Sequence, residues 1–501
     1  PGGGTLGVDW ALQHPTDYLT ALTAAVTEAR REAGAAADTI AGIGIDFTAS
    51  TVLPIDSEGQ ALCLRPEFAG RPHAWVKLWK HHAAQPQADR INEVTTARGE
   101  RFLDDYGGRT SSEWLVAKAL QILDEDPEIF ESAAGIVEAA DWTTSQLTGT
   151  LVRNACGAGY KGLWSRAHGF PPAEFFEALD PRMRDFVRDK LPGEIVAPGQ
   201  VVGGLTEAWA SRLELEAGTP VAAPIIDAHA GVLGATVVTP GRMVIVLGTS
   251  TCHMLLADRH APVEGVAGIV RDGIVEGLYG YEAGQAAVGD IFGWFAGLVG
   301  SPASDSASTF ARLETAAAAT GPGGNGLVAL DWWNGNRSVL ANADLSGLII
   351  GLSLQTTAGE LYRSLIEATG FGTRRILDAF EAEQIPVTEL VATGGLAERS
   401  PLLLRIYADI TQRPIRLAAS PNASALGAAI LGALAAGAER GGHGSLEAAV
   451  EQMAGLATET IEPDGEAARQ YEALYKEYLE LHDHFGRGGS AVMSRLRRLR
   501  R

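Results

Sequence analysis

Short apolar runs alternate with amphipathic helical patterns along most of the chain. Val221 to Ile226 and Met243 to Leu247 are mainly apolar runs, each followed by small or polar residues. A longer pattern with apolar residues at helical spacing covers about Thr357 to Phe380. This alternation of strand and helix predicts an α/β fold. Ligands of such folds bind beyond the carboxyl ends of strands, so polar residues that follow an apolar run are the first candidates for a site.

Asp227 is the strongest candidate in the first half of the chain. It directly follows the apolar run 221–226 and precedes a helical pattern of small residues that ends near Ala235. A carboxylate held at the end of a strand is a candidate general base. The alternative is that Asp227 caps a helix that starts at Ala228. The local sequence leaves both interpretations open.

Two other stretches of the first half could meet a ligand. Residues 46–50, which include Ala49, follow a strand predicted over Ile40 to Ile45, and they form either a ligand contact or a plain turn. Residues 154–161 are predicted to be a loop whose glycines let Lys161 approach a bound molecule, although a lone lysine on a loop is usually solvated. Between them, Trp75 and Trp79 predict a helix with an aromatic face.

The second half offers three turns with candidate chemistry. Gly248, Thr249, Ser250 and Thr251 form the tip of a predicted hairpin, whose hydroxyls and N–H groups can hold phosphate oxygens, although a threonine-rich β-turn is the alternative. Glu282 lies between glycines at a predicted strand-to-helix junction, where it either accepts hydrogen bonds from substrate hydroxyls or is a first-turn acid. Gly394 and Gly395 follow a predicted strand and could lie against a nucleotide, but two glycines alone are a weak signal.

Composition narrows the class of protein and of partner. A chain of 501 residues, 46% hydrophobic, predicts two or three domains with large cores. Its net charge of −21 argues against nucleic acid and anionic membrane surfaces as partners. The three cysteines show no metal or CxxC spacing and are expected to be reduced, and no apolar run reaches the roughly 18 residues of a membrane span. These features, with no signal peptide in view, predict a cytoplasmic protein. Its arginine-rich end is predicted to be a disordered basic tail.

Taken together and in order, the motifs resemble the FGGY family of carbohydrate kinases, in particular its members that act on L-ribulose. The resemblance covers nearly the whole chain, and several ordered motifs carry it better than any one alone. They are residues 9–15 (DWALQHP), 78–80 (LWK), 159–161 (GYK), 248–252 (GTSTC), 281–285 (YEAGQ) and 393–395 (TGG).

The resemblance implies a fold of two actin-like, ribonuclease-H-like α/β domains flanking a central cleft. Residues 1–238 would form the sugar-binding domain, residues 239–486 the ATP-binding domain and residues 487–501 the basic tail. The implied activity is ATP-dependent phosphorylation of L-ribulose to L-ribulose 5-phosphate, with Mg²⁺ as the other cofactor. Asp227 would take the proton of the sugar hydroxyl.

The resemblance also implies the remaining binding residues. Ala49, Lys161 and Glu282, with Asp227, would contact the sugar. Residues 248–251 would hold the phosphates of ATP, and Gly394 and Gly395 would lie along the nucleotide. The sequence offers no protein ligands for a metal ion, and it leaves the oligomeric state open, with a homodimer compatible.

One departure from the family concerns the start of the chain. The family opens each domain with a β-hairpin that faces the ATP phosphates, and no counterpart is found before the helix predicted to begin near Thr16. A missing hairpin would leave open a sugar-binding protein without turnover. Independently of it, two alternatives stay open: a different sugar kinase such as a D-ribulokinase or xylulokinase, and an actin-like ATPase without a sugar acceptor.

Overall fold

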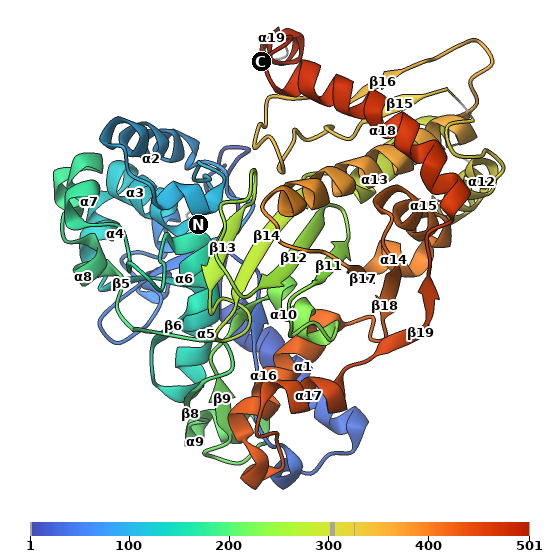
Figure 1. Ribbon diagram of the computed structural model, residues 1–501. Coiled ribbons are helices and arrows are strands. Elements are labelled where there is room, and N and C mark those ends of the chain that lie inside the picture. Colours follow the sequence, from blue (N-terminus) through green and yellow to red (C-terminus); the bar gives the residue numbers. More distant parts are fainter. Residues whose placement is uncertain (1–2, 301–305, 325, 500–501) are drawn as a thin grey trace. The chain divides into compact units, whose positions relative to one another are not determined.

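The computed structural model describes residues 3–300, 306–324 and 326–499 (Figure 1). The chain forms two compact units. The first contains Pro1–Val238, Gly268–Gly280 and Ser424–Ala454, and the second contains Thr239–Ala267, Tyr281–Ala423 and Gly455–Arg501. Helices and strands alternate in both, which confirms the predicted α/β class. Two stretches from the second half of the chain thus belong to the first unit. The expected division at residue 238 does not include them.

The first unit combines several small sheets with a large set of helices. Its sheets are β1-β4-β3-β5, the parallel pairs β10-β2 and β6-β7, and the antiparallel pair β8-β9. Its strands are β1 (Leu12–Gln13), β2 (Asp46–Phe47), β3 (Val52–Ile55), β4 (Val76–Lys77), β5 (Gly135–Glu138), β6 (Val152–Asn154), β7 (Glu194–Val196), β8 (Val201–Gly204), β9 (Pro220–Ala222), β10 (Ile225–Ile226) and β13 (Gly268–Arg271). Its helices are α1 (Pro15–Ala33), α2 (Gln85–Arg98), α3 (Leu115–Glu125), α4 (Pro127–Ser132), α5 (Ala139–Thr148), α6 (Ala155–Gly162), α7 (Ala173–Leu179), α8 (Phe186–Lys190), α9 (Glu207–Leu213), α10 (Asp227–Gly234), α16 (Ala423–Ala436) and α17 (Leu446–Met453).

Helix α16 lies directly against the backbone of α10 and of the segment before β2. A Cβ atom on Gly427 would come 1.9 Å from the carbonyl oxygen of Ala230, and one on Gly44 would come 1.8 Å from that of Ala428. Real Cβ atoms do not approach this closely, so both positions require glycine. The small-residue pattern of α16 therefore allows its backbone to approach α10 and the segment before β2 closely.

The second unit contains a large mixed sheet and the antiparallel pair β15-β16. Its strand order is β14-β12-β11-β17-β18-β19, with β11, β17 and β18 parallel and the hairpin β11-β12 antiparallel. The strands are β11 (Arg242–Leu247), β12 (Thr251–Ala257), β14 (Tyr279–Gln285), β15 (Val328–Leu330), β16 (Leu348–Ile350), β17 (Glu389–Thr393), β18 (Ile415–Ala418) and β19 (Leu456–Ile461). The helices are α11 (Gly289–Val299), α12 (Ser306–Ala318), α13 (Ala358–Ala382), α14 (Gly395–Arg399), α15 (Pro401–Thr411), α18 (Gly465–Gly486) and α19 (Val492–Leu499).

The long helices α13 and α18 pack together in the second unit (Figure 1). Thr357 begins α13 with a capping box, so the helix predicted there is confirmed. The ring of Phe371 lies between 5.3 and 6.0 Å from tyrosine rings of α18. Beside this aromatic contact, Arg363 Nε donates to Glu367 Oε1 at 2.8 Å, and both side chains are buried. Arg363 and Tyr471 also share a hydrogen bond of 2.7 Å, which ties α13 to α18.

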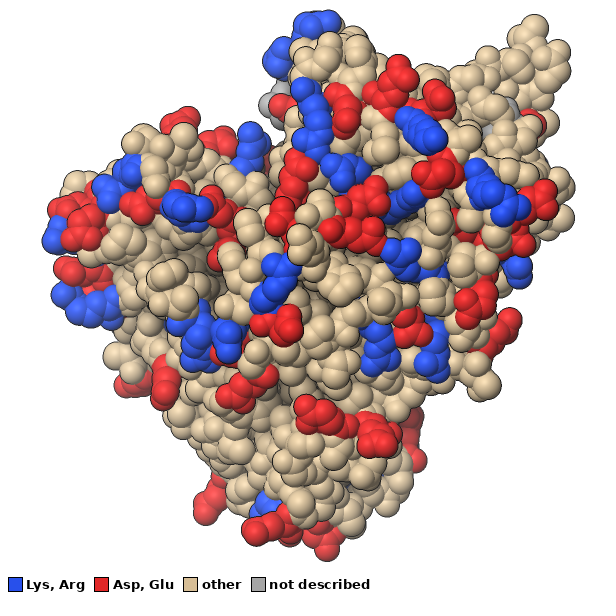
Figure 2. All heavy atoms as spheres, viewed as in Figure 1, with Lys and Arg blue, Asp and Glu red and all other residues tan. Residues whose placement is uncertain are grey.

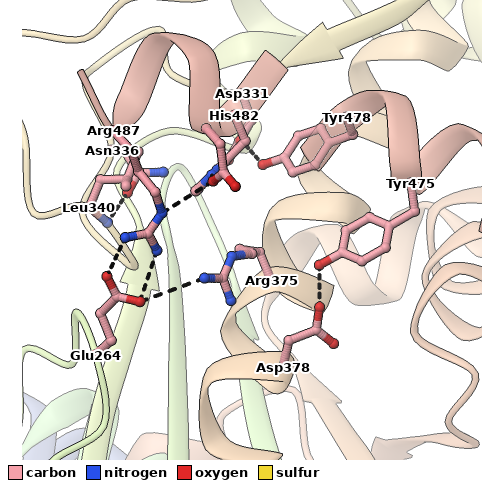
Figure 3. A network of polar contacts seen from close by, with 11 residues as sticks. Glu264, Asp331, Asn336, Leu340, Arg375, Asp378, Tyr475, Tyr478, His482 and Arg487 are labelled. Carbon is pink, nitrogen blue, oxygen red and sulfur yellow. Dashed lines mark hydrogen bonds and ion pairs between the residues drawn. The ribbon is translucent and has the colours of Figure 1, made fainter. Parts of the chain in front are cut away.

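The predicted disordered tail is wrong, because the described end of the chain is helical and anchored. Figure 3 shows Arg487, just past α18, against Glu264, and its two Nη atoms lie 2.8 and 2.9 Å from the carboxylate. Arg375 of α13 adds a second contact to the same carboxylate at 3.6 Å. Further along, α19 buries Met493. A bidentate pair and an apolar anchor, neither visible as a sequence pattern, order this basic segment.

Two local predictions in the first unit are also wrong. Trp75 and Trp79 do not lie on a helix, because Val76 and Lys77 pair with β1 as strand β4 and Trp75 Nε1 donates to the carbonyl of Ala69 at 2.9 Å. The strand predicted over Ile40 to Ile45 is reduced to one bridge at Ile43, with β2 following it. In both places pairing with a distant segment decides the local structure. Among residues 3–14, the structure has one short strand, β1, and its partner is β4.

Candidate active site

Asp227 lies at the carboxyl edge of a parallel strand pair in the first unit. Ile225 and Ile226 of β10 pair in register with Asp46 and Phe47 of β2, and Asp227 then begins α10. Its Oδ1 accepts the N–H of Ala228 at 2.7 Å, and the residue is half-buried. The helix thus starts one residue earlier than the capping interpretation supposed. The carboxylate stands at a strand end and bonds to a first-turn N–H, but the N-cap of α10 is Ile226, so the interpretation of Asp227 as the capping residue is wrong.

Ala49 leaves the same edge of this strand pair. It lies in the turn that follows Phe47, while Asp227 follows the register partner of Phe47. Burial raises the pKa of Asp46 at the start of this stretch. Ser50 closes the turn with a φ of 54°, in the left-handed region that residues other than glycine seldom adopt. The parallel pairing therefore brings Ala49 and Asp227, predicted separately, to one edge.

Lys161 lies on a helix, not on the predicted loop. Asn154 caps α6 by accepting the N–H of Gly157 at 2.6 Å, and a Cβ on Gly159 would come 2.2 Å from Val270. The glycines of this segment thus serve close helix packing instead of loop flexibility. Lys161 is 5% exposed, and its Nζ lies 5.9 Å from the ring centre of Trp114, a residue that the sequence did not single out.

Helix α6 also packs next to the helix that carries Asp227. The ring of Tyr160 lies 4.2 Å from the ring of His229 on α10. Lys161, the residue after Tyr160, is therefore carried by an element adjacent to α10. The three predicted sugar residues of the first unit lie on elements that contact one another.

At the hairpin tip of the second unit, the backbone carbonyls are hydrogen-bonded within the protein, whereas two backbone N–H groups are bonded to no backbone group that the structure describes. The N–H groups of Val288 and Asp290, at the start of α11, donate to the carbonyl of Thr249 at 2.9 and 3.2 Å, and Gly289 N–H donates to the carbonyl of Gly248 at 3.1 Å. Within the described residues, the N–H groups of Thr249 and Ser250 donate to no backbone carbonyl. An anion is bound by N–H donors and repelled by carbonyl oxygens. A tip whose carbonyls are already bonded and whose N–H groups are available to a ligand therefore suits an anion.

The four tip residues differ in exposure. Thr249 is exposed and Ser250 is half-buried, whereas Thr251 is fully buried at the start of β12. The hydroxyl of Thr251 accordingly faces the protein interior. Side-chain contact with a ligand is open to Thr249 and Ser250.

Gly394 and Gly395 stand beside this tip. Thr393 of β17 pairs in parallel with Val246 of β11, so Gly394 continues the sheet next to Leu247. Gly394 has a φ of 94°, and a Cβ there would come 2.6 Å from the carbonyl oxygen of Leu247. The position therefore requires glycine, and α14 begins immediately after it. The predicted nucleotide residues converge on one edge of one sheet.

Glu282 lies within strand β14, so the predicted strand-to-helix junction is wrong. The next helix, α11, begins at Gly289, which also removes the first-turn alternative for this acid. Glu282 is 3% exposed and pairs with Arg337, whose Nη2 lies 3.1 Å from Oε1. Sequence reasoning missed Arg337, because the two residues are 55 positions apart and no local pattern joins them.

Other site types find no support in the described parts of the chain. Those parts contain no group of three or more His, Cys, Asp or Glu side chains arranged to hold a metal ion. None of their helices combines the length and the apolar character that crossing a membrane requires. Figure 2 shows acidic and basic side chains interspersed over the face in view, without a broad basic field of the kind that nucleic acid binding uses.

Comparison with known proteins places this geometry in a family. The C-terminal domain of the FGGY family of carbohydrate kinases matches residues 243–436. A ribulokinase of Shouchella clausii is 52% identical over 99% of this chain and 90% of its own length. A ribulokinase of Halalkalibacterium halodurans is 50% identical over 99% of this chain and 89% of its own length.

Solved structures agree on the fold. A xylulose kinase of Rhodospirillum rubrum superimposes with a TM-score of 0.80 at 24% identity, covering 96% of this chain and 91% of that one. This likeness confirms the predicted fold class. Because relatives of about half-identical sequence extend over nearly the whole chain, the protein is a sugar kinase and belongs to the FGGY family of carbohydrate kinases, in its ribulokinase group.

Proposed function

We propose that the chain transfers the γ-phosphoryl group of ATP to L-ribulose, giving L-ribulose 5-phosphate and ADP. The observation that carries the proposal is the half-buried carboxylate of Asp227 at the carboxyl edge of β10, on a chain half-identical to ribulokinases. A positioned carboxylate there can accept a hydroxyl proton, the one proton transfer that phosphorylation of an alcohol requires. The cysteines form no disulfide within the described residues, which together with the need for ATP favours the cytoplasm as the location of the protein.

In this proposal the sugar is bound by Ala49, Lys161, Asp227 and Glu282. The second unit binds ATP through the tip 248–251 and the pair Gly394 and Gly395. The N–H groups of Thr249 and Ser250 support the phosphate assignment, since their carbonyl neighbours are already bonded to α11.

The chemical step then needs little from the protein beyond position and charge. The terminal hydroxyl oxygen of the sugar forms a bond to the γ-phosphorus, the bond from phosphorus to the bridging oxygen of ADP breaks, and the hydroxyl proton passes to Asp227. Mg²⁺ enters bound to ATP, as part of the donor, and offsets the charge of its phosphates. Lys161 supplies a fixed cation beside the sugar, held next to Trp114.

A coupled assay of ADP release over a panel of pentuloses and pentitols tests the proposed substrate. ADP release should depend on the added sugar and be fastest, by kcat/KM, with L-ribulose. Faster turnover of D-xylulose or D-ribulose would place the chain with another sugar kinase. ADP release that ignores added sugar would identify an ATPase without a sugar acceptor. Calorimetric binding of sugar without turnover would identify a binding protein.

Replacement of Glu282 by alanine should raise the KM for L-ribulose by about tenfold or more, because a buried carboxylate that accepts sugar hydroxyls is lost. The KM for ATP should change by less than about twofold. Glu282→Gln is the matched control, since its amide oxygen can still accept from Arg337. If the KM for L-ribulose stays at the wild-type value in Glu282→Ala, Glu282 does not bind the sugar and has only a structural role as the partner of Arg337.

A further inference from the structure

One peptide bond next to the turn that holds Ala49 is bound at both ends by buried charged side chains. Lys118 Nζ donates to the carbonyl oxygen of Ser50 at 2.6 Å. The N–H of the following residue, Thr51, donates to Glu138 Oε2 at 2.9 Å. The carbonyl and the N–H belong to the same peptide unit. A cation therefore binds its negative end and a carboxylate its positive end.

Both charged groups come from rigid elements of the first unit. Lys118 lies on α3 and has no exposed surface, and Glu138 ends β5 and is 5% exposed. Lys118 Nζ also donates to the carbonyl of Leu78 at 2.8 Å. On the other side, Ala139 N–H donates to the carbonyl of Thr51 at 2.7 Å. The peptide is thus fixed from α3 and from the β5–α5 junction.

This arrangement is a poor way to stabilise a fold. Burial lowers the pKa of Lys118 to about 7 and raises the pKa of Glu138 to about 7, so each charged form is disfavoured by its surroundings. Apolar side chains of similar volume would fill such a position at least as well. The two charged groups instead fix the orientation of one peptide. Charge-assisted hydrogen bonds are the strongest hydrogen bonds that side chains can make to a peptide.

The bound peptide controls a strained turn. Ser50 has a φ of 54°, a left-handed conformation that L-residues other than glycine adopt only when their surroundings impose it. Ala49 precedes it, in the stretch that leaves β2 beside Asp227. The hydroxyl of Thr51 also donates to the carbonyl of Ala49 at 3.3 Å, so the bound peptide is linked to Ala49.

We propose that Lys118 and Glu138 are positioning residues for the sugar. They clamp the Ser50–Thr51 peptide and thereby hold the turn containing Ala49 in the conformation that contacts L-ribulose. The inference rests on the proposed function, because it assigns the turn to sugar binding. Neither residue touches the sugar in this proposal, and both act through the backbone.

The decisive variant is Lys118→Met, with Lys77→Met as its matched control. Lys77 is equally buried, in the same core, but its Nζ donates to the carbonyl of His73 at 3.1 Å. Lys118→Met should lose thermal stability, because the buried carboxylate of Glu138 then lacks its nearby cation. Lys118→Met alone should raise the KM for L-ribulose by about 10- to 100-fold while the KM for ATP changes by less than about twofold. Equal sugar KM values in the two variants, or a wild-type value in Lys118→Met, would overturn the proposal.

A second variant keeps the test decisive if Lys118→Met does not fold. Glu138→Gln retains an acceptor oxygen of the same shape but loses the charge. It should accelerate hydrogen exchange of the Thr51 amide by about tenfold, measured without substrate, and raise the L-ribulose KM by about three- to tenfold. Unchanged exchange would overturn the clamp. Accelerated exchange in a protein whose wild type does not phosphorylate L-ribulose would instead leave the clamp standing and reject the proposed substrate.

Discussion

Replacement of Asp227 by asparagine is expected to lower kcat by about 10² to 10⁴, the usual contribution of a positioned general base. Asparagine keeps the size of the side chain and an oxygen that can accept the N–H of Ala228, so α10 should still begin at the same place. What disappears is the basic carboxylate that accepts the sugar proton. Steady-state rates with saturating L-ribulose and ATP measure the loss, and the affinity for ATP should change little.

The control separates the base from the structural contact. Asp227→Ala removes both the base and the acceptor for Ala228, so it should lose as much activity as Asp227→Asn and also be less stable by about 1 kcal/mol, the usual net value of one hydrogen bond, which lowers its Tm. If Asp227 served only to start the helix, the asparagine variant would turn over at nearly the wild-type rate. That result would show that the base lies elsewhere.

The largest expected effect on stability follows from Arg363→Met. Arg363 binds Glu367, Tyr471 and the carbonyl of Ala317, and its side chain is 6% exposed. Its removal leaves the buried carboxylate of Glu367 without its cation, which typically costs about 3 to 5 kcal/mol. Burial already raises the pKa of Glu367, so the variant should take up a proton there. Chemical denaturation followed by tryptophan fluorescence measures the change.

Arg374→Met is the matched control on the same helix. Arg374 also joins α13 to α18, through Glu472 at 2.6 Å, but the side chain of Glu472 is 42% exposed. Ion pairs reached by solvent contribute about 1 kcal/mol or less. Similar losses in the two variants would mean that burial does not set the strength of these pairs.

The sequence predicted best those parts of the fold that have a long periodic pattern of apolar residues or a clear signal, such as glycine, at the end of an element. Helix α13 has its capping box and many turns of apolar spacing. The strand predicted before Gly394 is likewise present, as β17. In these segments local preference and tertiary structure agree.

The missed features depend on contacts between distant residues. Glycines near Lys161 indicated a loop because nothing local shows that Val270 packs against them. Glu282 was placed by its glycine neighbours, whereas strand pairing and Arg337 decide its position. Lys118 and Glu138 gave no signal, since a charged residue within an apolar pattern usually faces solvent. Both side chains bind a backbone peptide, and a contact to the backbone produces no pattern in the spacing of side chains.

The composition of the first unit from three separate stretches has a consequence for its synthesis. Helix α16, which the backbone near Gly44 and α10 require as a neighbour, is encoded after residue 422. A ribosome therefore has to complete most of the chain before the first unit can close, although domains ordinarily fold in the order of their translation. Until then α10 and the segment before β2 present uncovered small-residue surfaces. A fragment that ends at residue 238 is consequently expected to need chaperone protection, and a separately supplied α16–α17 segment should restore its fold.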